Sequence, residues 1–595
     1  MTLLSPRRSG PAIFALALFA LASAPALPQE KSAKEEAKTG QSTNIRLSME
    51  QIPSPPASLP VLRLSTQKPP MDFVQEVLRR LDPNAQKLVP LAQIPQLAGK
   101  GGKLPEEFVG ALSGEHLAVY VDLRSGDAEI FPSLAQKGLA AERESQQLER
   151  AQQVAQEIFS RADLLQKDAT AFSFEKPRAL YGEAAERGAE GGEAKASSRD
   201  LYLTYVTLRR NVNNYFVYGP GSRAMVAVGN NGTVEGFVRH WKTGAVSGEV
   251  RETRKREQVA EAILDQLRPI AKTADVEVLN TEVAYYDGNR DYLQPVYRFT
   301  ARLHRRDSEG RESKAHVDDD FVIGYVPIGK PREPIPSLTA LPGAPPKVAK
   351  AGRPVPERPG DPTVGRYVVR NDNSNWVANA NELWGGLTSF FGGFLFTDAQ
   401  YFWAEPWEFT SNEAAFVNSV NLAENEVHGD WWLFSTLSNC CDLVDLTTIP
   451  ASEGYGAAHG GHLDYWILHS CEVVPSAADA PCPTDSRAWW TPWFNLFQGM
   501  HTVVGYRTIM WIDDDVTGPY GLSLRFGAPV VSAWFNATTS AAGYQGNPTY
   551  PAHCGRTPPM GRPSTVSACG RQNDWVYDTT ALPPANCLIN FWQPN

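Results

Sequence analysis

The cysteines and tryptophans of this 595-residue chain are concentrated toward its C-terminal end. All seven cysteines follow residue 439, and of the fifteen tryptophans only Trp241 precedes residue 376. So sharp a change in composition indicates units of different kinds, and at ~150 residues per domain the length predicts three or four domains. Residues 366–595 are therefore predicted to form a separate Cys- and Trp-rich domain.

The N-terminus has the pattern of an export signal. Arg7 and Arg8 precede an apolar run at 12–22, and Ala24-Pro25-Ala26 has the small residues of a cleavage site. We expect a signal peptide at 1–28, a flexible leader at 29–60, and a protein that is secreted or held in the cell envelope or periplasm. The alternative is an uncleaved anchor helix, for which a run of about 11 residues is short, because a membrane span needs ~20.

Charge and hydropathy exclude two further classes of protein. The net charge is −10, from 56 basic and 66 acidic residues, whereas a general nucleic-acid binder needs a basic surface. No internal stretch approaches the length of a membrane span, so we expect no span after signal removal. We therefore expect neither a nucleic-acid partner nor a membrane-embedded domain, and the oligomeric state stays open.

Residues 61–182 are predicted to form an α+β segment. Residues 117–131 have the pattern of a hairpin that turns at Ser125-Gly126-Asp127, and 140–165 have the composition and apolar spacing of a helix. Residues 183–198 are rich in Gly, Ala and Glu, and we interpret them as a linker.

Residues 200–330 are predicted to form a compact α+β domain. Three or four strands precede residue 242, with Asn230-Asn231-Gly232 as a turn between two of them, and a helix at 256–268 is followed by strands around 276–286 and 293–304. The segment V-x-G-P-G-S-x-x-x-V-x-V-G-x-x-G-x-V within it resembles small propeptide domains of secreted bacterial peptidases, which inhibit the enzyme or assist its folding. The alternative is an α+β domain with a structural or binding role.

A Pro-rich linker is predicted at 331–365, because ten prolines lie between 331 and 362. Its basic residues Lys347, Lys350 and Arg353 would be accessible to proteases.

The C-terminal domain is predicted to be a three-layer α/β domain with a parallel sheet. Residues 463–472 and 497–506 have the pattern of buried strands, and 527–535 of a helix or a strand. In such sheets functional residues lie at the carboxyl ends of the strands.

Two segments of this domain carry a family resemblance. His428-Gly429 is followed 43 residues later by Cys471, at the end of an apolar strand, and F-x-G-x-x-x-V-x-G-Y follows at 497–506. This arrangement is similar to the caspase, legumain and gingipain group of cysteine peptidases. Over about residues 365–540 it more closely resembles an uncharacterised family of bacterial secreted domains with H-G, S-C-E and F-x-G-x-H-x-x-x-G-[FY] segments.

The peptidase resemblance implies a caspase-like fold and a Cys-His dyad. Cys471 would be the nucleophile, His428 the proton-transfer partner, and the backbone N–H groups of Gly429 and Cys471 the oxyanion donors. The chain departs from the group in having His469-Ser470 before the cysteine, and no specificity pocket can be assigned. His459-Gly460 is a rival His-Gly pair, but only 12 residues separate it from Cys471.

Other chemistry remains open for the same residues. Cys471 could be a disulfide partner, although an odd number of cysteines leaves at least one without an intramolecular partner; if it is Cys471, the other six could form three bridges, such as Cys554–Cys569. His459 and His462 could bind zinc with a third ligand, and Asp513-Asp514-Asp515 could bind calcium. We favour loop histidines and a solvated turn, and expect no metal or cofactor. The tryptophans are expected in the core and loops rather than on a sugar-binding face.

The sequence therefore predicts an exported cysteine peptidase, a hydrolase acting on a protein or peptide substrate and restrained by its N-terminal region. The alternative is a non-catalytic secreted interaction or binding module on the same fold, because a fold does not fix a function. The substrate and the cleavage-site preference stay open.

Overall fold

The computed structural model describes residues 44–594 apart from short internal segments, and these residues belong to one compact unit. The segments outside the description are 55, 83–86, 95–105, 135–138, 141–143, 162–163, 167, 189–191, 273, 306–318, 339–361, 369–373, 390–395, 437–442, 480–487 and 551–556. The predicted signal peptide, part of the leader and most of the Pro-rich linker therefore lie outside the described residues.

An antiparallel sheet is formed from the first half of the chain. Its strands run in the order β9 (Arg178–Gly188), β11 (Asp200–Val212), β13 (Ser222–Gly229), β14 (Val234–Trp241), β6 (Ala128–Ile130), β5 (His116–Asp122), β4 (Phe108–Ser113) and β3 (Val89–Pro90). Three short strands pair at its margin, namely β7 (Leu139–Ala140), β8 (Ala171–Phe174) and β10 (Gly192–Ala196). Helices α1 (Met71–Leu81) and α3 (Glu144–Phe159) share an apolar core with this sheet.

Local signals in the sequence identify several of these elements correctly. The predicted hairpin is β5–β6, and the predicted helix at 140–165 is the shorter α3. The Asn230-Asn231-Gly232 turn joins β13 to β14, and Gly232 adopts φ +81°, a left-handed conformation that glycine adopts at little cost.

A second sheet carries the strand that approaches the candidate site. Its strands are β1 (Ile45–Arg46), β2 (Leu59–Ser65), β12 (Tyr215–Tyr218), β15 (Thr243–Val250), β16 (Ala274–Asp287), β17 (Tyr292–Arg305) and β18 (Asp319–Pro327). Helix α4 (Arg256–Leu267) packs against β18, so the helix predicted at 256–268 and the strands predicted after it are confirmed.

The C-terminal part has a mixed sheet with a parallel centre. The strands follow the order β20 (Thr397–Phe402), β19 (Thr363–Val368), β21 (Leu422–Glu426), β25 (Tyr465–His469), β26 (Thr502–Tyr506), β27 (Pro563–Ala568) and β28 (Cys587–Trp592). The first five are parallel, and β27 and β28 are antiparallel to their neighbours. The α/β class predicted for this domain is confirmed.

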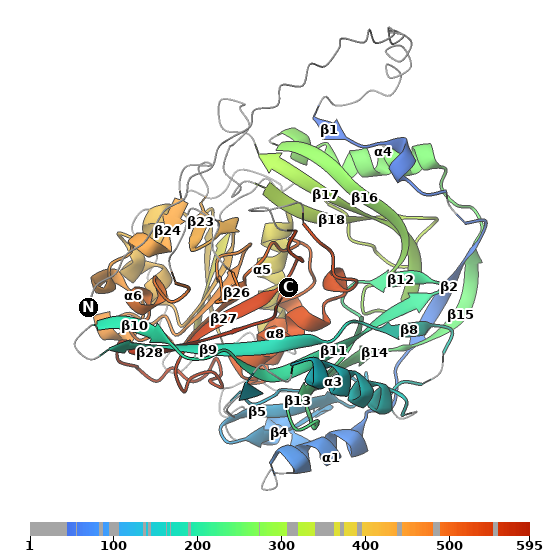
Figure 1. The fold of residues 1–595 in the computed structure, drawn as a ribbon. Coiled ribbons are helices and arrows are strands. Elements are labelled where there is room, and N and C mark those ends of the chain that lie inside the picture. The colour runs from blue at the N-terminus through green and yellow to red at the C-terminus, as the bar shows by residue number, and fades with distance from the viewer. Residues whose placement is uncertain are drawn as a thin grey trace, which may run out of the picture. The chain divides into compact units, whose positions relative to one another are not determined.

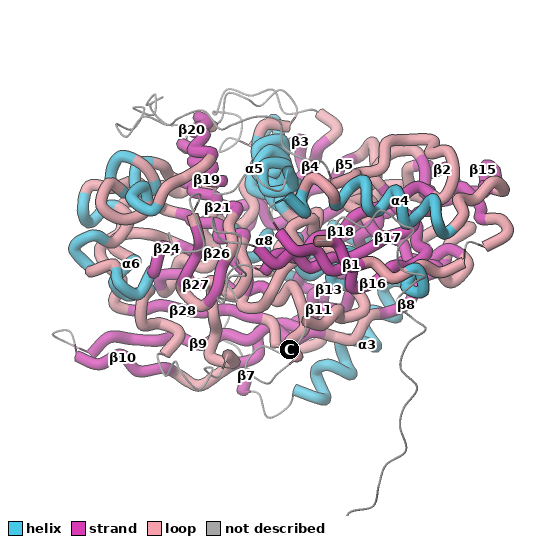
Figure 2. Tube along the Cα trace, turned by 90° about the horizontal axis from the view of Figure 1, so that it is seen from above, coloured by secondary structure: helices cyan, strands magenta, loops and turns pink. Residues whose placement is uncertain are grey.

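Both faces of this sheet are buried, which makes the domain three-layered. Along β25, Tyr465 and Ile467 enter one apolar core, whereas Trp466 and Leu468 enter another. The first core contains side chains of α5 (Ser374–Leu387), α7 (Thr517–Arg525) and α8 (Val530–Ser540), and the second contains those of α6 (Trp493–Leu496). Figures 1 and 2 show α6 and α8 on opposite sides of β26. Of the segment predicted as a helix or a strand at 527–535, residues 530–535 belong to helix α8.

A small separate sheet follows the strand that leads to His428. It consists of β22 (Gly429–Asp430), β23 (Leu433–Ser435) and β24 (Leu443–Asp445).

Strand pairing joins the first half of the chain to its C-terminus. Strand β9 pairs with β28 from Tyr181↔Trp592 to Glu186↔Cys587, and the two strands lie side by side in Figure 1. The prediction of a linker at 183–198 is therefore wrong, because most of these residues belong to β9 and β10. The remaining domain boundaries stay a prediction.

No helix among the described residues has both the length and the apolar character needed to cross a membrane.

Candidate functional site

The two residues of the predicted dyad follow neighbouring parallel strands. Glu426, the last residue of β21, pairs in register with His469, the last residue of β25. His428 and Cys471 each lie two residues beyond these partners, so both belong to the carboxyl edge of the sheet. The strand register thus places His428 and Cys471 at equivalent positions beyond the ends of adjacent strands.

Gly429 lies directly against the backbone that carries the cysteine. A Cβ atom at this position would clash with the Ser470 hydroxyl, the Val473 side chain and the carbonyl oxygen of Cys471. The His-Gly pair of the motif therefore has a steric reason, since only glycine allows this approach. The assignment of the Gly429 and Cys471 N–H groups as oxyanion donors stays a prediction.

His428 is buried and its ring is oriented by two neighbours. The Asp320 carboxylate at the start of β18 forms an ion pair with His428 Nδ1, and both side chains are almost fully buried. The Trp376 ring contacts the imidazole edge-on, with 5.2 Å between the ring centroids. His428 is thus held by a residue that precedes the Pro-rich segment.

Cys471 is a free thiol with only 7% of its surface exposed. Burial is the largest cause that raises the pKa of this thiol far above its usual value; the Met510 N–H opposes it, and the charges of Glu472, Asp320 and Asp430 add to it. The Met510 N–H donates to the sulfur at 3.4 Å. In this structure the group at position 471 is therefore a protonated thiol.

The start of β18 is attached to the loop at 511–513. The Phe321 carbonyl accepts from the Ile512 N–H at 2.9 Å, and the Ile323 N–H donates to the Asp513 carboxylate at 3.1 Å. The Phe321 ring also packs edge-on against Trp511 and Tyr550. Residues 319–323 are thus fixed to the loop that carries Met510.

The rival His-Gly pair and the zinc hypothesis gain no support from the described residues. His459 is exposed, and its Nε2 contacts the Ala451 carbonyl at 2.9 Å. Neither His459 nor His462 belongs to the group of three potential metal ligands found in the described part of the chain.

The prediction of a solvated turn at Asp513-Asp514-Asp515 is wrong for its central residue. Asp514 is buried, and its Oδ2 accepts hydrogen bonds from the hydroxyls of Tyr506 at 2.7 Å and Tyr544 at 2.8 Å. These donors make it possible to bury a carboxylate.

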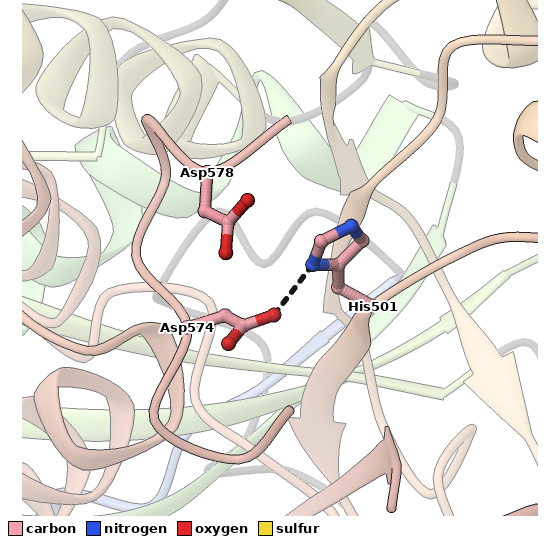
Figure 3. A group of neighbouring side chains, drawn as sticks. All are labelled: His501, Asp574 and Asp578. Atoms are coloured by element: carbon pink, nitrogen blue, oxygen red, sulfur yellow. Dashed lines mark hydrogen bonds and ion pairs between the residues drawn. The ribbon is translucent and has the colours of Figure 1, made fainter. Parts of the chain in front are cut away.

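The potential metal ligands that do lie together are His501, Asp574 and Asp578 (Figure 3). His501 Nδ1 contacts Asp574 at 2.6 Å, and Nε2 donates to the Thr580 carbonyl at 2.8 Å. The Arg571 guanidinium lies 3.6 Å from Asp574 and 3.7 Å from Asp578. Because Arg571 lies near both carboxylates and both nitrogens of His501 have partners, the group is explained as an ion cluster.

The described cysteines correct one predicted bridge. Cys569 pairs with Cys587, so it is not the partner of Cys554. Cys440, Cys441, Cys482 and Cys554 lie outside the described residues.

A cavity of about 580 Å³ lies away from Cys471, lined in part by Asp127, Glu129, Lys242 and His240. His240 Nε2 contacts Glu129 at 2.8 Å and Nδ1 contacts Asp127 at 3.4 Å. Acidic and basic residues both line the cavity, so the lining favours no particular charge on a ligand.

Sequence reasoning missed Asp320, Met510 and the role of His469. The sequence shows an acidic run at 318–320. However, Asp320 and His428 lie on opposite sides of the Pro-rich segment, so their contact could not be recognised from the sequence. His469 was noticed only as a departure from the family pattern. Met510 acts through its backbone, which leaves no signal in the side-chain pattern.

Comparison with known proteins gives a family for one part of the chain. Residues 365–557 match DUF6345, a domain of unknown function. The resemblance to an uncharacterised domain family, expected over about residues 365–540, thus agrees with this match. The caspase-type motifs stay a prediction. No curated protein matches the sequence.

Two solved structures are similar at low identity. One is an uncharacterized protein from Eubacterium rectale, at 7% identity and a TM-score of 0.24, with 46% of this chain and 86% of that chain covered. The other is a secreted C11 cysteine protease from Bacteroides thetaiotaomicron in complex with an irreversible peptide inhibitor, at 13% identity and a TM-score of 0.21, with 35% and 66% covered. The structural similarity to a cysteine protease is therefore weak.

Proposed function

We propose that the C-terminal domain is a cysteine peptidase of an exported protein, with Cys471 as nucleophile and His428 as proton-transfer partner. The observation that carries the proposal is the register Glu426↔His469, which puts His428 and Cys471 at equivalent positions beyond adjacent parallel strands. The close approach of Gly429 to Cys471 supports it, because a reacting carbonyl needs backbone donors beside the nucleophile.

The chemistry follows from these positions. His428 takes the proton of the Cys471 thiol, and the thiolate forms a bond to the peptide carbonyl carbon. The peptide C–N bond breaks as His428 delivers the proton to the leaving amine. Water then attacks the thioester, which releases the carboxylic acid and restores the thiol. The N–H groups of Gly429 and Cys471 are the proposed donors to the oxyanion.

The N-terminal region restrains this site in the proposed resting state. Asp320 occupies the Nδ1 side of His428, and residues 319–323 are hydrogen-bonded to the loop at 512–513. Cys471 is itself buried, and burial raises the pKa of its thiol. Cleavage of the Pro-rich segment would leave the β9–β28 pairing in place, so release of the site would require residues 319–323 to detach from the loop at 512–513.

The burial of Cys471 also favours the second candidate, a non-catalytic secreted interaction module. A thiol with a raised pKa in an apolar environment is chemically inert. The two candidates differ in whether removal of the Asp320 contact exposes a reactive site.

Peptide hydrolysis by the full-length protein tests the proposal. A peptide mixture is incubated with the wild type, with Asp320→Ala, and with Asp320→Ala combined with Cys471→Ala, and new termini are identified by mass spectrometry. We expect cleavage by Asp320→Ala and none by the double variant. Equal cleavage by the double variant, or none by any folded variant, would overturn the peptidase assignment.

A further inference from the structure

Three buried ionisable residues are in contact next to the strand ends that lead to the candidate dyad. Glu426 and His469 are register partners at the strand ends, and His469 Nδ1 contacts Glu426 Oε2 at 2.9 Å. On the other side, His469 Nε2 contacts Asp514 Oδ2 at 3.1 Å. All three side chains are almost completely buried. The cross-strand pair therefore ties together the strand ends that lead to His428 and Cys471.

Each ring nitrogen of His469 faces a carboxyl oxygen of this group. Burial lowers the pKa of His469, but Glu426 and Asp514 outweigh it and raise the pKa well above its usual value. An imidazolium between two carboxylates has both of its N–H donors used, and charge-assisted bonds of this kind are stronger than neutral ones. The geometry of the group is accordingly fixed on both sides of the ring.

Asp514 extends the group to the loop that contacts the cysteine. Its Oδ2 accepts from the Tyr544 hydroxyl at 2.8 Å, and the same hydroxyl accepts from the Trp511 N–H at 3.1 Å. Trp511 follows Met510, whose N–H donates to the Cys471 sulfur at 3.4 Å. A chain of hydrogen bonds thus leads from His469 to the peptide group next to that donor.

Glu426 extends the group to the same loop from the other side. Its Oε2 accepts from Asn379 Nδ2 at 3.1 Å, and Asn379 Nδ2 also donates to the Ile512 carbonyl at 2.6 Å. The loop is therefore held at Trp511 through Asp514 and at Ile512 through Glu426.

We propose that Glu426, His469 and Asp514 form a positioning unit that keeps the Met510 N–H on the sulfur of Cys471. An N–H group aimed at the sulfur favours the thiolate over the thiol, so the unit would prepare Cys471 for nucleophilic attack. The role of this unit in catalysis rests on the proposed function. The effect of the loop on the ionisation of the Cys471 thiol does not rest on it. The three residues are positioning residues because they act through Met510.

The test is the pH profile of Cys471 alkylation in the full-length protein. Iodoacetamide modification is followed by mass spectrometry between pH 6 and 10 for the wild type, Tyr544→Phe and Asp514→Asn. Tyr544→Phe keeps the ring but removes the link between Asp514 and Trp511. The matched control is Tyr520→Phe, because Tyr520 is equally buried and its hydroxyl donates to the Val530 carbonyl outside the group.

We expect Tyr544→Phe and Asp514→Asn to move the profile to higher pH and to slow alkylation at neutral pH roughly three- to tenfold, the effect of losing one hydrogen bond. Tyr520→Phe should follow the wild-type profile. A folded Tyr544→Phe protein with the wild-type profile would overturn the proposal even if Asp514→Asn does not fold. Cys471 that stays unmodified in every protein at every pH would overturn it as well. A shifted profile without peptide hydrolysis would refute only the peptidase assignment.

Discussion

The Asp320 carboxylate forms an ion pair with Nδ1 of His428, and the two residues come from opposite sides of the Pro-rich segment. The contact is almost fully buried, and breaking a buried pair by removing one partner leaves an uncompensated group behind. It therefore joins the region before the Pro-rich segment to the candidate dyad in a specific way. The proposed restraint consists of this one contact and the backbone bonds of residues 319–323.

Replacing Gly429 tests whether the His-Gly pair is required by packing. Gly429→Ala should lower the free energy of unfolding by roughly 1–3 kcal/mol, because the added methyl group overlaps Ser470, Val473 and the Cys471 carbonyl. The matched control is Gly385→Ala in α5, where the added methyl group meets no atom within 4 Å. The control should be neutral or more stable by about 0.5–1 kcal/mol, since alanine favours a helix. Urea denaturation measures both, and equal effects of the two substitutions would refute the steric argument.

The Cys569–Cys587 bridge should contribute to stability. It closes a loop with a sequence separation of 18 residues, for which restriction of the unfolded chain predicts about 3 kcal/mol. The paired change Cys569→Ser and Cys587→Ser should therefore lower the midpoint of thermal unfolding under oxidising conditions. Under reducing conditions the variant and the wild type should unfold at similar temperatures. A persistent difference after reduction would mean that the serines disturb the fold in another way.

Stability should depend on pH through His240. Burial lowers its pKa, but Asp127 and Glu129 outweigh it and raise the pKa to about 9, above the usual value of about 6.5. Because the pKa of His240 is higher in the folded state, protonation of His240 stabilises that state. This contribution is complete below about pH 6.5 and disappears as pH rises through 9. His240→Gln should thus cost roughly 1–3 kcal/mol more at pH 6 than at pH 9.5.

Denaturation of wild type and variant at both pH values measures this difference. His459→Gln is the control, because His459 is exposed and its ring nitrogen contacts a backbone carbonyl. A cost of His240→Gln that is the same at pH 6 and pH 9.5 would contradict the assigned charge.

The local elements could be predicted because their signals are local. The apolar run before Cys471 identifies β25, and the Asn-Gly turn identifies the β13–β14 hairpin. Parallel neighbouring strands end at the same edge of a sheet, which places His428 near the same edge as Cys471. These inferences need only the periodicity of the chain and the general arrangement of parallel sheets.

The contacts between distant segments could not be predicted in this way. Gly, Ala and Glu are depleted in strands, so 183–198 has the composition of a linker, yet pairing with β28 makes part of it a strand. Asp514 was misinterpreted for a similar reason, because its partners Tyr506 and Tyr544 become neighbours only after folding. Asp320 likewise has no sequence signal that connects it with His428.

The rate of Cys471 alkylation in the full-length protein tests the central claim most directly. Native, non-reduced wild type, Asp320→Ala and Asp319→Asn are treated with iodoacetamide, and modification of Cys471 is followed by mass spectrometry. Asp319 is the matched control, since it lies next to Asp320 but pairs with Arg302. The account predicts a slow reaction in the wild type and the control, and a rate at least about tenfold higher in Asp320→Ala, because loss of one buried charge contact is worth more than about 1.4 kcal/mol. Cys471 found in a disulfide, or an Asp320→Ala rate no higher than that of the wild type, would contradict it.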